Sequence, residues 1–322
     1  MNQKIKNLLK VVLPLLLGVF LIWYSLSKVS IDKLLVYAQN ANYSWIVLGM
    51  FLGLLSHISR AYRWRFMLLP IGYHVKFGNT FMAVFAAYLI NYTIPRAGEV
   101  ARASLLTNYE GVPFEKGFGT IVAERIADMI VMLGIMLITL FLQFDFIYGF
   151  LMERFNPLKV IMFMVIGLIL FFIMAFFVTR SQSAIAIKIK TFVSGLVEGV
   201  LSIFKMRNKW AYIFHTLFIW GMYVLMFYVT TFAISELGVV QPGAVLVGFI
   251  SASFSIAATN GGIGSYPLAV YAAFALFGIP EEPSIAYGWI MWASQTLVII
   301  VCGGLSLIYL PIYNRKYIKI KG

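Results

Sequence analysis

The chain is a succession of long apolar segments separated by short charged ones. Most of these segments approach or exceed the roughly 20 residues that cross a bilayer as a helix. We therefore predict an all-α polytopic membrane protein, with residues 1–322 forming a single transmembrane domain. The apolar runs are 11–27, 34–56, 77–95, 129–144, 160–179, 210–235, 237–280 and 283–314.

The distribution of Lys and Arg predicts how the chain is threaded, because cytoplasmic loops of membrane proteins collect positive charge. Charge-rich segments are expected inside, and charge-poor ones outside. Both termini are then cytoplasmic. The segments expected inside are the N-terminal tail, 60–76, Lys116, 180–209 and the C-terminal tail, and those expected outside are 28–42, 143–159, 236–243 and 281–284.

This threading requires two helical hairpins of opposite orientation. Residues 60–76 and Lys116 share a side, so the chain between them enters the membrane and returns. The loops that flank 244–280 also share a side. The hairpin tips are expected at 91–102 and 260–267, beside about six full spans. Paired broken hairpins that enter from opposite faces are typical of inverted repeats in transporters.

Composition supports the membrane assignment and explains the basic charge. The chain is 61% hydrophobic and 11% charged, whereas soluble domains carry about 25% charged residues. The net charge of +13 follows from cytoplasmic loops, and no nucleic-acid module accompanies it. Helical spacing of apolar residues with interspersed lysines predicts a cytoplasmic amphipathic segment at 181–205, for which a plain connecting helix is the alternative.

The first candidate site is the tip at 91–102. A proline removes a backbone donor and a glycine loosens the chain, so the helix breaks here. Arginine is suited to bidentate phosphate contact. Arg96, Glu99 and Arg102 follow one another at intervals of three residues, which places them roughly along one side of a helix. An ordinary membrane-edge loop with a neutralising glutamate is the alternative. The residues concerned are Asn91, Pro95, Arg96, Gly98, Glu99 and Arg102.

The second candidate is the charged group Glu124, Arg125 and Asp128 at the start of an apolar run. Glu124 and Asp128 are four residues apart and share a helix face. Charged residues inside membrane helices are costly and by default face the bundle interior. We therefore expect this acidic pair to meet Arg96 or Arg102. A snorkelling cluster at the interface is the alternative.

Two further segments have phosphate-binding chemistry. Arg60 and Arg63 share a helical face, with a lipid-headgroup site and a positive-inside anchor carrying an interfacial Trp as equal alternatives. The tip at 260–267 is glycine-rich, which allows close backbone approach and aims the amides of a restarting helix at an anion. A packing turn is the alternative there. This tip contains Asn260, Gly261, Gly262, Gly264 and the helix-breaking Pro267.

Neither metal nor cofactor chemistry is indicated by the remaining residues. His57, His74 and His215 are scattered, and they do not group with the single Cys302 at metal-ligand spacing. The sequence lacks a Walker loop, a dinucleotide fingerprint and a nucleophile signature. We therefore expect no catalytic residues, no bound metal and no cofactor.

These motifs, in this order and each at a helix boundary, resemble the transmembrane region of the lysylphosphatidylglycerol synthase/flippase family. The most specific parts are Pro95–Glu99 with Arg102, and Glu124-Arg125 with Asp128. In two-domain members this region is joined to a soluble aminoacyl-transferase domain. The resemblance implies a stand-alone member that moves a product lipid between leaflets, located in a bacterial cytoplasmic membrane.

Three function classes follow. The favoured one is a lipid translocator for phosphatidylglycerol or another anionic or aminoacylated phospholipid, with arginines holding the phosphate. A membrane glycosyltransferase using a polyprenyl-phosphate sugar would need acidic residues gathered on external loops, where the sequence has them scattered. An accessory subunit of a lipid-modifying enzyme is the third. The protein partners considered are a second copy of the chain, forming a homo-oligomer, and a lipid-modifying enzyme. The external acids are Asp32, Asp145, Glu153, Glu236, Glu281 and Glu282.

Overall fold

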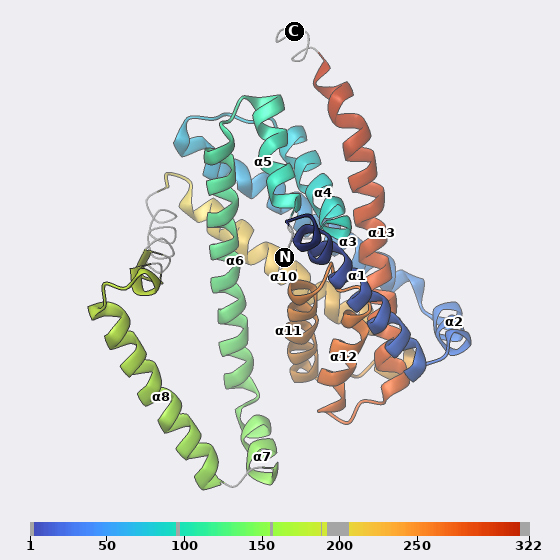
Figure 1. Cartoon of the computed structure of the whole chain (residues 1–322). Helices are drawn as coiled ribbons and strands as arrows, with labels where there is room; N and C mark the ends of the chain where they lie inside the picture. The colour runs from blue at the N-terminus through green and yellow to red at the C-terminus, as the bar shows by residue number, and fades with distance from the viewer. Residues whose placement is uncertain (1–2, 95–96, 155–156, 188, 192–205, 316–322) are drawn as a thin grey trace. The chain divides into compact units, whose positions relative to one another are not determined.

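The structure is a computed structural model that describes residues 3–94, 97–154, 157–187, 189–191 and 206–315 (Figure 1). Every regular element in these ranges is helical. The α-helices are α1 (Gln3–Lys28), α2 (Ile31–Asn40), α3 (Tyr43–Leu68), α4 (Phe77–Thr93), α5 (Ala97–Glu110), α6 (Phe114–Leu142), α7 (Phe144–Arg154), α8 (Pro157–Arg180), α10 (Lys209–Thr231), α11 (Pro242–Ala258), α12 (Ser265–Ala275) and α13 (Glu281–Tyr313), and the 3-10 turns are η1 (Leu69–Ile71) and η2 (Ser235–Leu237).

Within the described ranges, four helices are long and apolar enough to cross a membrane, namely α3 with η1, α6, α10 and α13. A bent pair, Val165–Arg180 with Ala184–Thr191, makes a fifth when it is counted as one span. These helices confirm the all-α polytopic membrane class. Most of the expected amphipathic segment at 181–205 lies outside the described residues.

Two predicted boundaries differ from those observed. The apolar run 34–56 is divided between α2 and α3, because the Asn42 side chain caps α3 by accepting a hydrogen bond from the Ser44 amide. The span expected from residue 129 begins at Phe114 instead. Its charged residues, Glu124 among them, therefore lie inside a continuous helix and not at its start.

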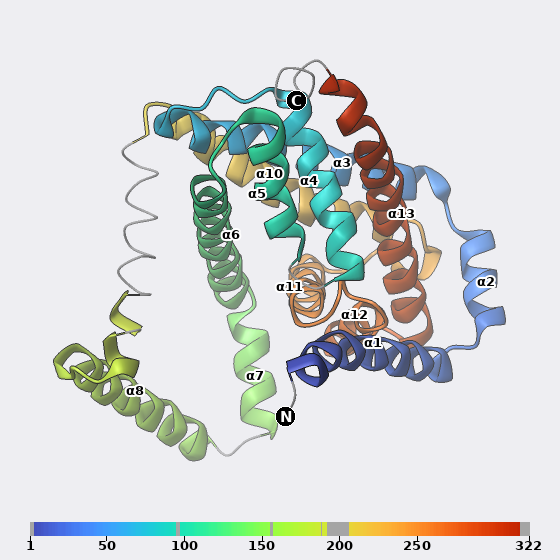
Figure 2. The same ribbon diagram turned by 45° about the horizontal axis from the view of Figure 1, so that its top comes forward.

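The two hairpins are present as pairs of short helices. Helix α4 packs on α5, and α11 packs on α12 (Figures 1 and 2). Their lengths are 17, 14, 17 and 11 residues. At about 1.5 Å per residue even the longer arms reach only about 26 Å, less than the roughly 30 Å of a hydrocarbon core. Each arm is thus shorter than a full span.

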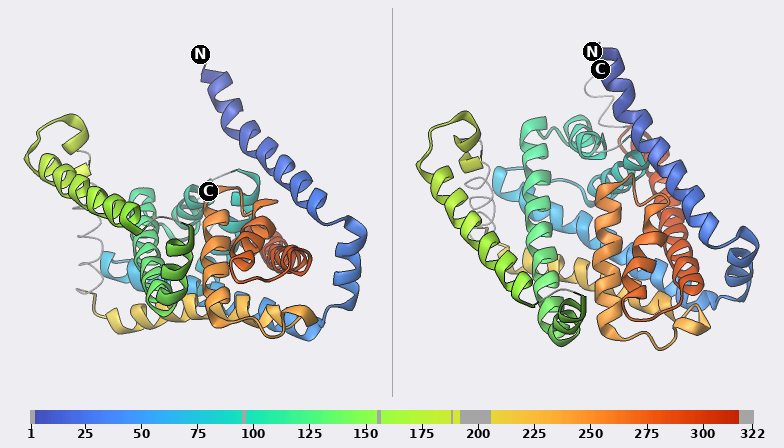
Figure 3. Two further views of the ribbon diagram at one scale, coloured as in Figure 1. Left: turned by 90° about the horizontal axis from the view of Figure 1, so that it is seen from below. Right: turned by 60° about the horizontal axis from the view of Figure 1, so that its bottom comes forward.

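Helix α13 is the common support of both hairpins. It packs against α4 of the first hairpin and α12 of the second, and it also contacts α3. Helix α1 runs beside α12 (Figure 3). The chain separates into two compact units, residues 1–124 with 210–322, and residues 125–209. In the second unit α7 packs on α8.

Candidate functional site

A buried cluster of three arginines and one glutamate lies inside the first unit. Helix α3 supplies Arg60 and Arg63, α5 supplies Arg102, and α6 supplies Glu124. The exposed fraction is 3% for Arg60 and Arg102 and 0% for Arg63 and Glu124. Of the predicted contacts between the acidic pair and Arg96 or Arg102, the one between Glu124 and Arg102 is confirmed, and Arg60 and Arg63 also contact Glu124.

The cluster is held by short, charge-assisted contacts. Arg102 donates through Nη1 and Nη2 to the two carboxylate oxygens of Glu124, at 3.2 and 2.9 Å. Arg60 Nη1 donates to Glu124 Oε1 at 2.8 Å, and Arg63 Nη2 lies 3.4 Å from the same oxygen. The Arg102 fork has the two-pronged geometry with which guanidinium groups also recognise phosphate.

Aromatic and hydroxyl side chains fix the arginines in place. The Arg102 guanidinium lies 3.7 Å from the centre of the Trp64 ring, and Trp64 Nε1 donates to Thr120 Oγ1 at 2.8 Å. Arg63 Nη1 donates to Thr216 Oγ1 at 2.9 Å. Trp64 is fully buried, so this segment is not the interfacial anchor considered above. Its ring belongs to the apolar core between α3, α4, α5 and α6.

Among the contacts that the structure describes, three guanidinium groups share the carboxylate of Glu124. The Nε atom of Arg102 is buried and has no hydrogen-bond partner among the described residues. Buried charges are normally fully paired, because an unpaired one is costly. A buried guanidinium with an unpartnered N–H donor in a membrane helix bundle is therefore suited to an anionic ligand.

The first hairpin is closed by a side chain that caps its second helix. Asn91 Oδ1 accepts a hydrogen bond from the Gly98 amide at 2.7 Å, and Asn91 Nδ2 donates to Glu99 Oε2 at 3.3 Å. A Cβ added at Gly98 would lie 2.1 Å from the Ala87 carbonyl oxygen. Only glycine allows this approach of α5 to α4. Pro95 and Arg96 lie outside the described residues, so their predicted roles stay predictions.

The second hairpin turns through glycines with positive φ. Gly261, Gly262 and Gly264 have φ of 62°, 79° and 69°, a region that favours glycine. Gly264 also packs against the backbone of α1, where an added Cβ would lie 2.5 Å from the Ile22 nitrogen. Pro267 lies in the first turn of α12, where its missing N–H breaks no helical hydrogen bond.

The tips of the two hairpins meet. A Cβ at Gly261 would lie 2.9 Å from the Tyr92 ring, which therefore rests directly on this glycine. The hydroxyls of Tyr92 and Thr296 are 3.1 Å apart. Trp292 Nε1 donates to the Gly261 carbonyl at 2.8 Å. Two neighbouring turns of α13 thus hold both tips. The close approach of the Tyr92 ring explains why a residue without a side chain stands at position 261.

The other predicted residues divide between the two units. Asn260 is 9% exposed and its Nδ2 has no hydrogen-bond partner in the part of the chain that the structure describes. Arg125 is exposed and Asp128 is buried, and both lie in the second unit. No group of three His, Cys, Asp or Glu residues suited to a metal occurs among the described residues.

Sequence reasoning missed four side chains that build these sites. Trp64 and Thr216 hold the arginines, and Tyr92 and Trp292 hold the tips. The signal for Tyr92 was its place beside Asn91 at a helix break. Trp64 stands between two arginines, but an interfacial Trp has the same sequence pattern. Thr216 and Trp292 give no local signal.

The chain is an integral membrane protein, because it forms a bundle of apolar helices with two broken hairpins. Its candidate site is the buried cluster of charged residues between these helices. The chain belongs to the family described as the lysylphosphatidylglycerol synthase transmembrane region, which matches residues 11–304. It is also similar to the UPF0104 membrane protein of Methanocaldococcus jannaschii, with 29% identity over 134 residues. That match covers 41% of this chain and 40% of the archaeal protein.

Proposed function

We propose that this protein translocates an anionic phospholipid, of the phosphatidylglycerol type or an aminoacylated derivative, between the two leaflets of its membrane. The observation that carries the proposal is the buried group of Arg60, Arg63 and Arg102 around the carboxylate of Glu124. Membership of a family described by an aminoacyl-lipid synthase supports a lipid as the substrate.

In this proposal a lipid phosphate competes with Glu124 for the arginines. A phosphate and a carboxylate offer a guanidinium the same bidentate partner. Arg102 exchanges its fork from Glu124 to the phosphate, while Glu124 keeps its 2.8 Å contact with Arg60. Because Glu124 occupies the cluster when no lipid is present, the arginines are never left without an anion. This keeps the cost of buried charge low in both states.

Besides arginines for the phosphate, a transport site of this kind needs irregular backbone at membrane depth, and in this proposal the two hairpins supply it. Such backbone is tolerated only where protein or a wet cavity satisfies it, and here Asn91 accepts from the Gly98 amide and Trp292 donates to the Gly261 carbonyl. Helices broken at the centre of opposed hairpins are the usual frame of a transport site. This frame favours movement of a ligand over chemistry on it.

The experiment is leaflet exchange in proteoliposomes. Purified protein is reconstituted with fluorescent phosphatidylglycerol, and a membrane-impermeant quencher reports exchange. Arg102→Gln is compared with Arg207→Gln, since Arg207 is an exposed arginine outside the cluster. We expect Arg102→Gln to lower the exchange rate at least about tenfold, the size of one lost charged hydrogen bond of about 1.5 kcal/mol. Arg207→Gln should exchange at the parental rate.

Folding of each variant is checked by size exclusion, and Arg102→Lys serves as a conservative second variant. Lysine keeps the charge but loses the fork, so its rate should fall between those of the parent and Arg102→Gln. Parental exchange in a folded Arg102→Gln protein would refute the role of the cluster. An absence of exchange in the folded parent would instead favour a membrane transferase or an accessory subunit.

A further inference from the structure

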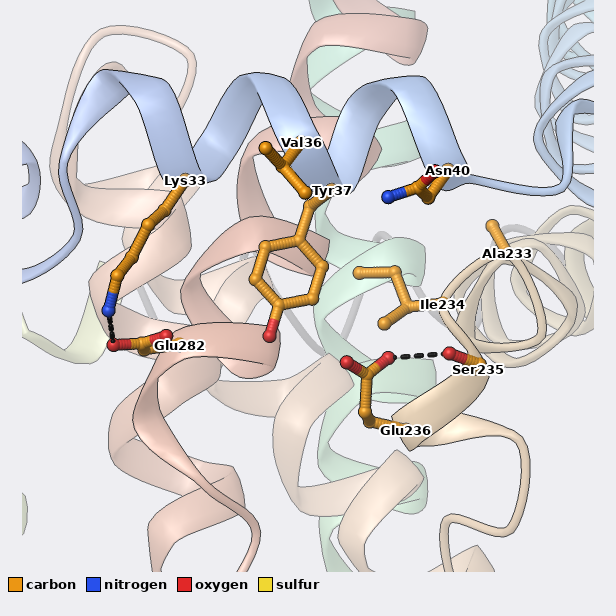
Figure 4. A pocket seen from close by; sticks show the side chains of 9 residues that line it. All are labelled: Lys33, Val36, Tyr37, Asn40, Ala233, Ile234, Ser235, Glu236 and Glu282. Atoms are coloured by element: carbon orange, nitrogen blue, oxygen red, sulfur yellow. Dashed lines mark hydrogen bonds and ion pairs between the residues drawn. The ribbon is translucent and has the colours of Figure 1, made fainter.

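A second polar site lies at the other end of α3 from the arginine cluster. A cavity of about 320 Å³ opens between α2, η2 and the first turn of α13 (Figure 4). The backbone N–H of Asn42, at the start of α3, donates a hydrogen bond of 2.9 Å to the backbone carbonyl of Ala233, a residue that lines the cavity. Arg60 is 18 residues further along, about 27 Å by helix rise. The threading expected from charge places this cavity outside.

Acidic groups that are scattered in the sequence come together in this cavity. Glu236 enters from η2, and Glu282 from the first turn of α13. Tyr37 points between them from the middle of α2, as Figure 4 shows. Asn40 lies on the same side as Tyr37, and Ile234 supplies an apolar wall. The expectation of dispersed external acids is therefore wrong for this pair.

One ammonium group of the chain itself lines the cavity and is paired with a carboxylate there. Lys33 Nζ makes an ion pair with Glu282 at the edge of the cavity (Figure 4). The neighbouring Glu281 is paired with Lys28 at 3.4 Å. Glu236 differs from both, because among the described residues it accepts a hydrogen bond from the neutral Ser235 hydroxyl at 2.7 Å and makes no ion pair. One carboxylate in the cavity thus lacks a cation.

The Tyr37 phenol reports the same negative environment. Burial, together with the carboxylates of Glu236 and Glu282, raises the pKa of Tyr37. The phenol therefore stays protonated at neutral pH and adds no charge of its own. Its ring offers a face to a cation, and its hydroxyl, the Asn40 amide oxygen and the Glu236 carboxylate offer three acceptors for three N–H donors.

We infer that this cavity binds a primary ammonium group carried on a short apolar chain, with Glu236 as its counter-ion. The ammonium lies between Glu236 and Tyr37, and the carbon chain lies along Ile234. A volume near the lower end of ordinary ligand sites, about 300–1,000 Å³, limits the occupant to a small amine or a single headgroup. The inference does not depend on lipid translocation.

The test uses calorimetric titration of the full chain in detergent with n-pentylamine, and with 1-pentanol and pentanoate as matched probes. We expect only the amine to bind. Glu236→Gln should weaken amine binding at least about tenfold, because it removes the charge from a charge-assisted hydrogen bond. Glu115→Gln, an exposed acid in the first turn of α6, should bind the amine with parental affinity.

A second variant acts in the opposite direction. Lys33→Gln removes the internal ammonium and frees Glu282, so amine binding should tighten by about threefold, the size of an exposed ion pair. A variant that merely loosens the fold would not tighten binding. Equal binding of amine and alcohol, no amine binding by the folded parent, or unchanged affinity in Glu236→Gln would each overturn the inference.

A final arm separates a lipid headgroup from a free amine. The protein is taken up in nanodiscs of phosphatidylcholine with either phosphatidylethanolamine or phosphatidylglycerol, and retained lipid is identified by native mass spectrometry. Retention of phosphatidylethanolamine that depends on Glu236 assigns the site to an amino lipid. Pentylamine binding without such retention assigns it to a soluble amine. Both results support an ammonium site.

Discussion

Replacing Glu124 removes a carboxylate that all three arginines of the cluster contact. Glu124→Gln keeps the size of the side chain and one acceptor oxygen, but it loses the negative charge that receives two bonds from Arg102, one from Arg60 and the 3.4 Å approach of Arg63. Breaking a buried ion pair by removing one partner costs about 3–5 kcal/mol. Because Gln can still accept a hydrogen bond, we expect a loss near the lower value, about 3 kcal/mol.

The loss is measured as the free energy of unfolding in mixed micelles titrated with a denaturing detergent, with tryptophan fluorescence as the signal. Glu124→Leu, which keeps no acceptor, should reach the upper value of about 5 kcal/mol. Glu115→Gln, exposed on the same helix, should stay within about 0.5 kcal/mol of the parent.

Adding Arg102→Gln to Glu124→Gln tests the like-charge argument directly. Without Glu124, each guanidinium repels the other two, so the second substitution should recover part of the loss and the two should be non-additive by about 1–3 kcal/mol. If Glu124→Gln unfolds within about 0.5 kcal/mol of the parent, or if the two substitutions simply add, the cluster is not energetically coupled as described.

Three further substitutions follow from the packing. Gly98→Ala should destabilise by about 1–3 kcal/mol, because its Cβ would meet the backbone carbonyl of α4 at 2.1 Å, whereas Gly119→Ala, with nothing within 4 Å, should be neutral or stabilising by up to about 1 kcal/mol in the same unfolding assay. Gly261→Ala should displace the Tyr92 ring and strain a φ of 62°, lowering the thermal midpoint, and a midpoint equal to that of the parent would refute the tip contact. Asn314→Leu should increase protease cleavage at the end of α13, because it removes the paired amide bonds of 2.7 and 2.9 Å to α4.

The sequence was sufficient to predict features set by local rules. Charges in apolar runs must find partners, so a contact of the acidic pair with Arg96 or Arg102 could be predicted from where the charges stand in the sequence, and Glu124 does contact Arg102. Gly98 and Gly261 marked the hairpin tips, because glycine is the residue that permits close approach and positive φ. These predictions rest on the cost of an unpaired charge and on backbone sterics, which do not require knowledge of the whole fold.

The contacts that complete the sites could not be predicted in this way. Tyr92 and Thr296 are 204 residues apart, and Arg63 and Thr216 are 153 apart. The residues around each of these side chains give no indication of which distant segment it contacts. Arg63 beside Trp64 has the pattern of an interfacial anchor, and only the packing of α5 and α6 around them shows that both are buried. Glu236 and Glu282 are likewise distant in the sequence. Only the fold brings both of them, together with Tyr37 of α2, to the lining of one cavity.

The position of α13 in the chain has a consequence for biosynthesis. Both hairpins pack against this helix, which the ribosome makes after them, and their arms are shorter than a full span, so their packing is complete only once α13 has emerged. Nascent chains released before this helix should be recognised as incomplete by membrane quality-control proteases, whereas loss of α2 should leave both hairpins with their support.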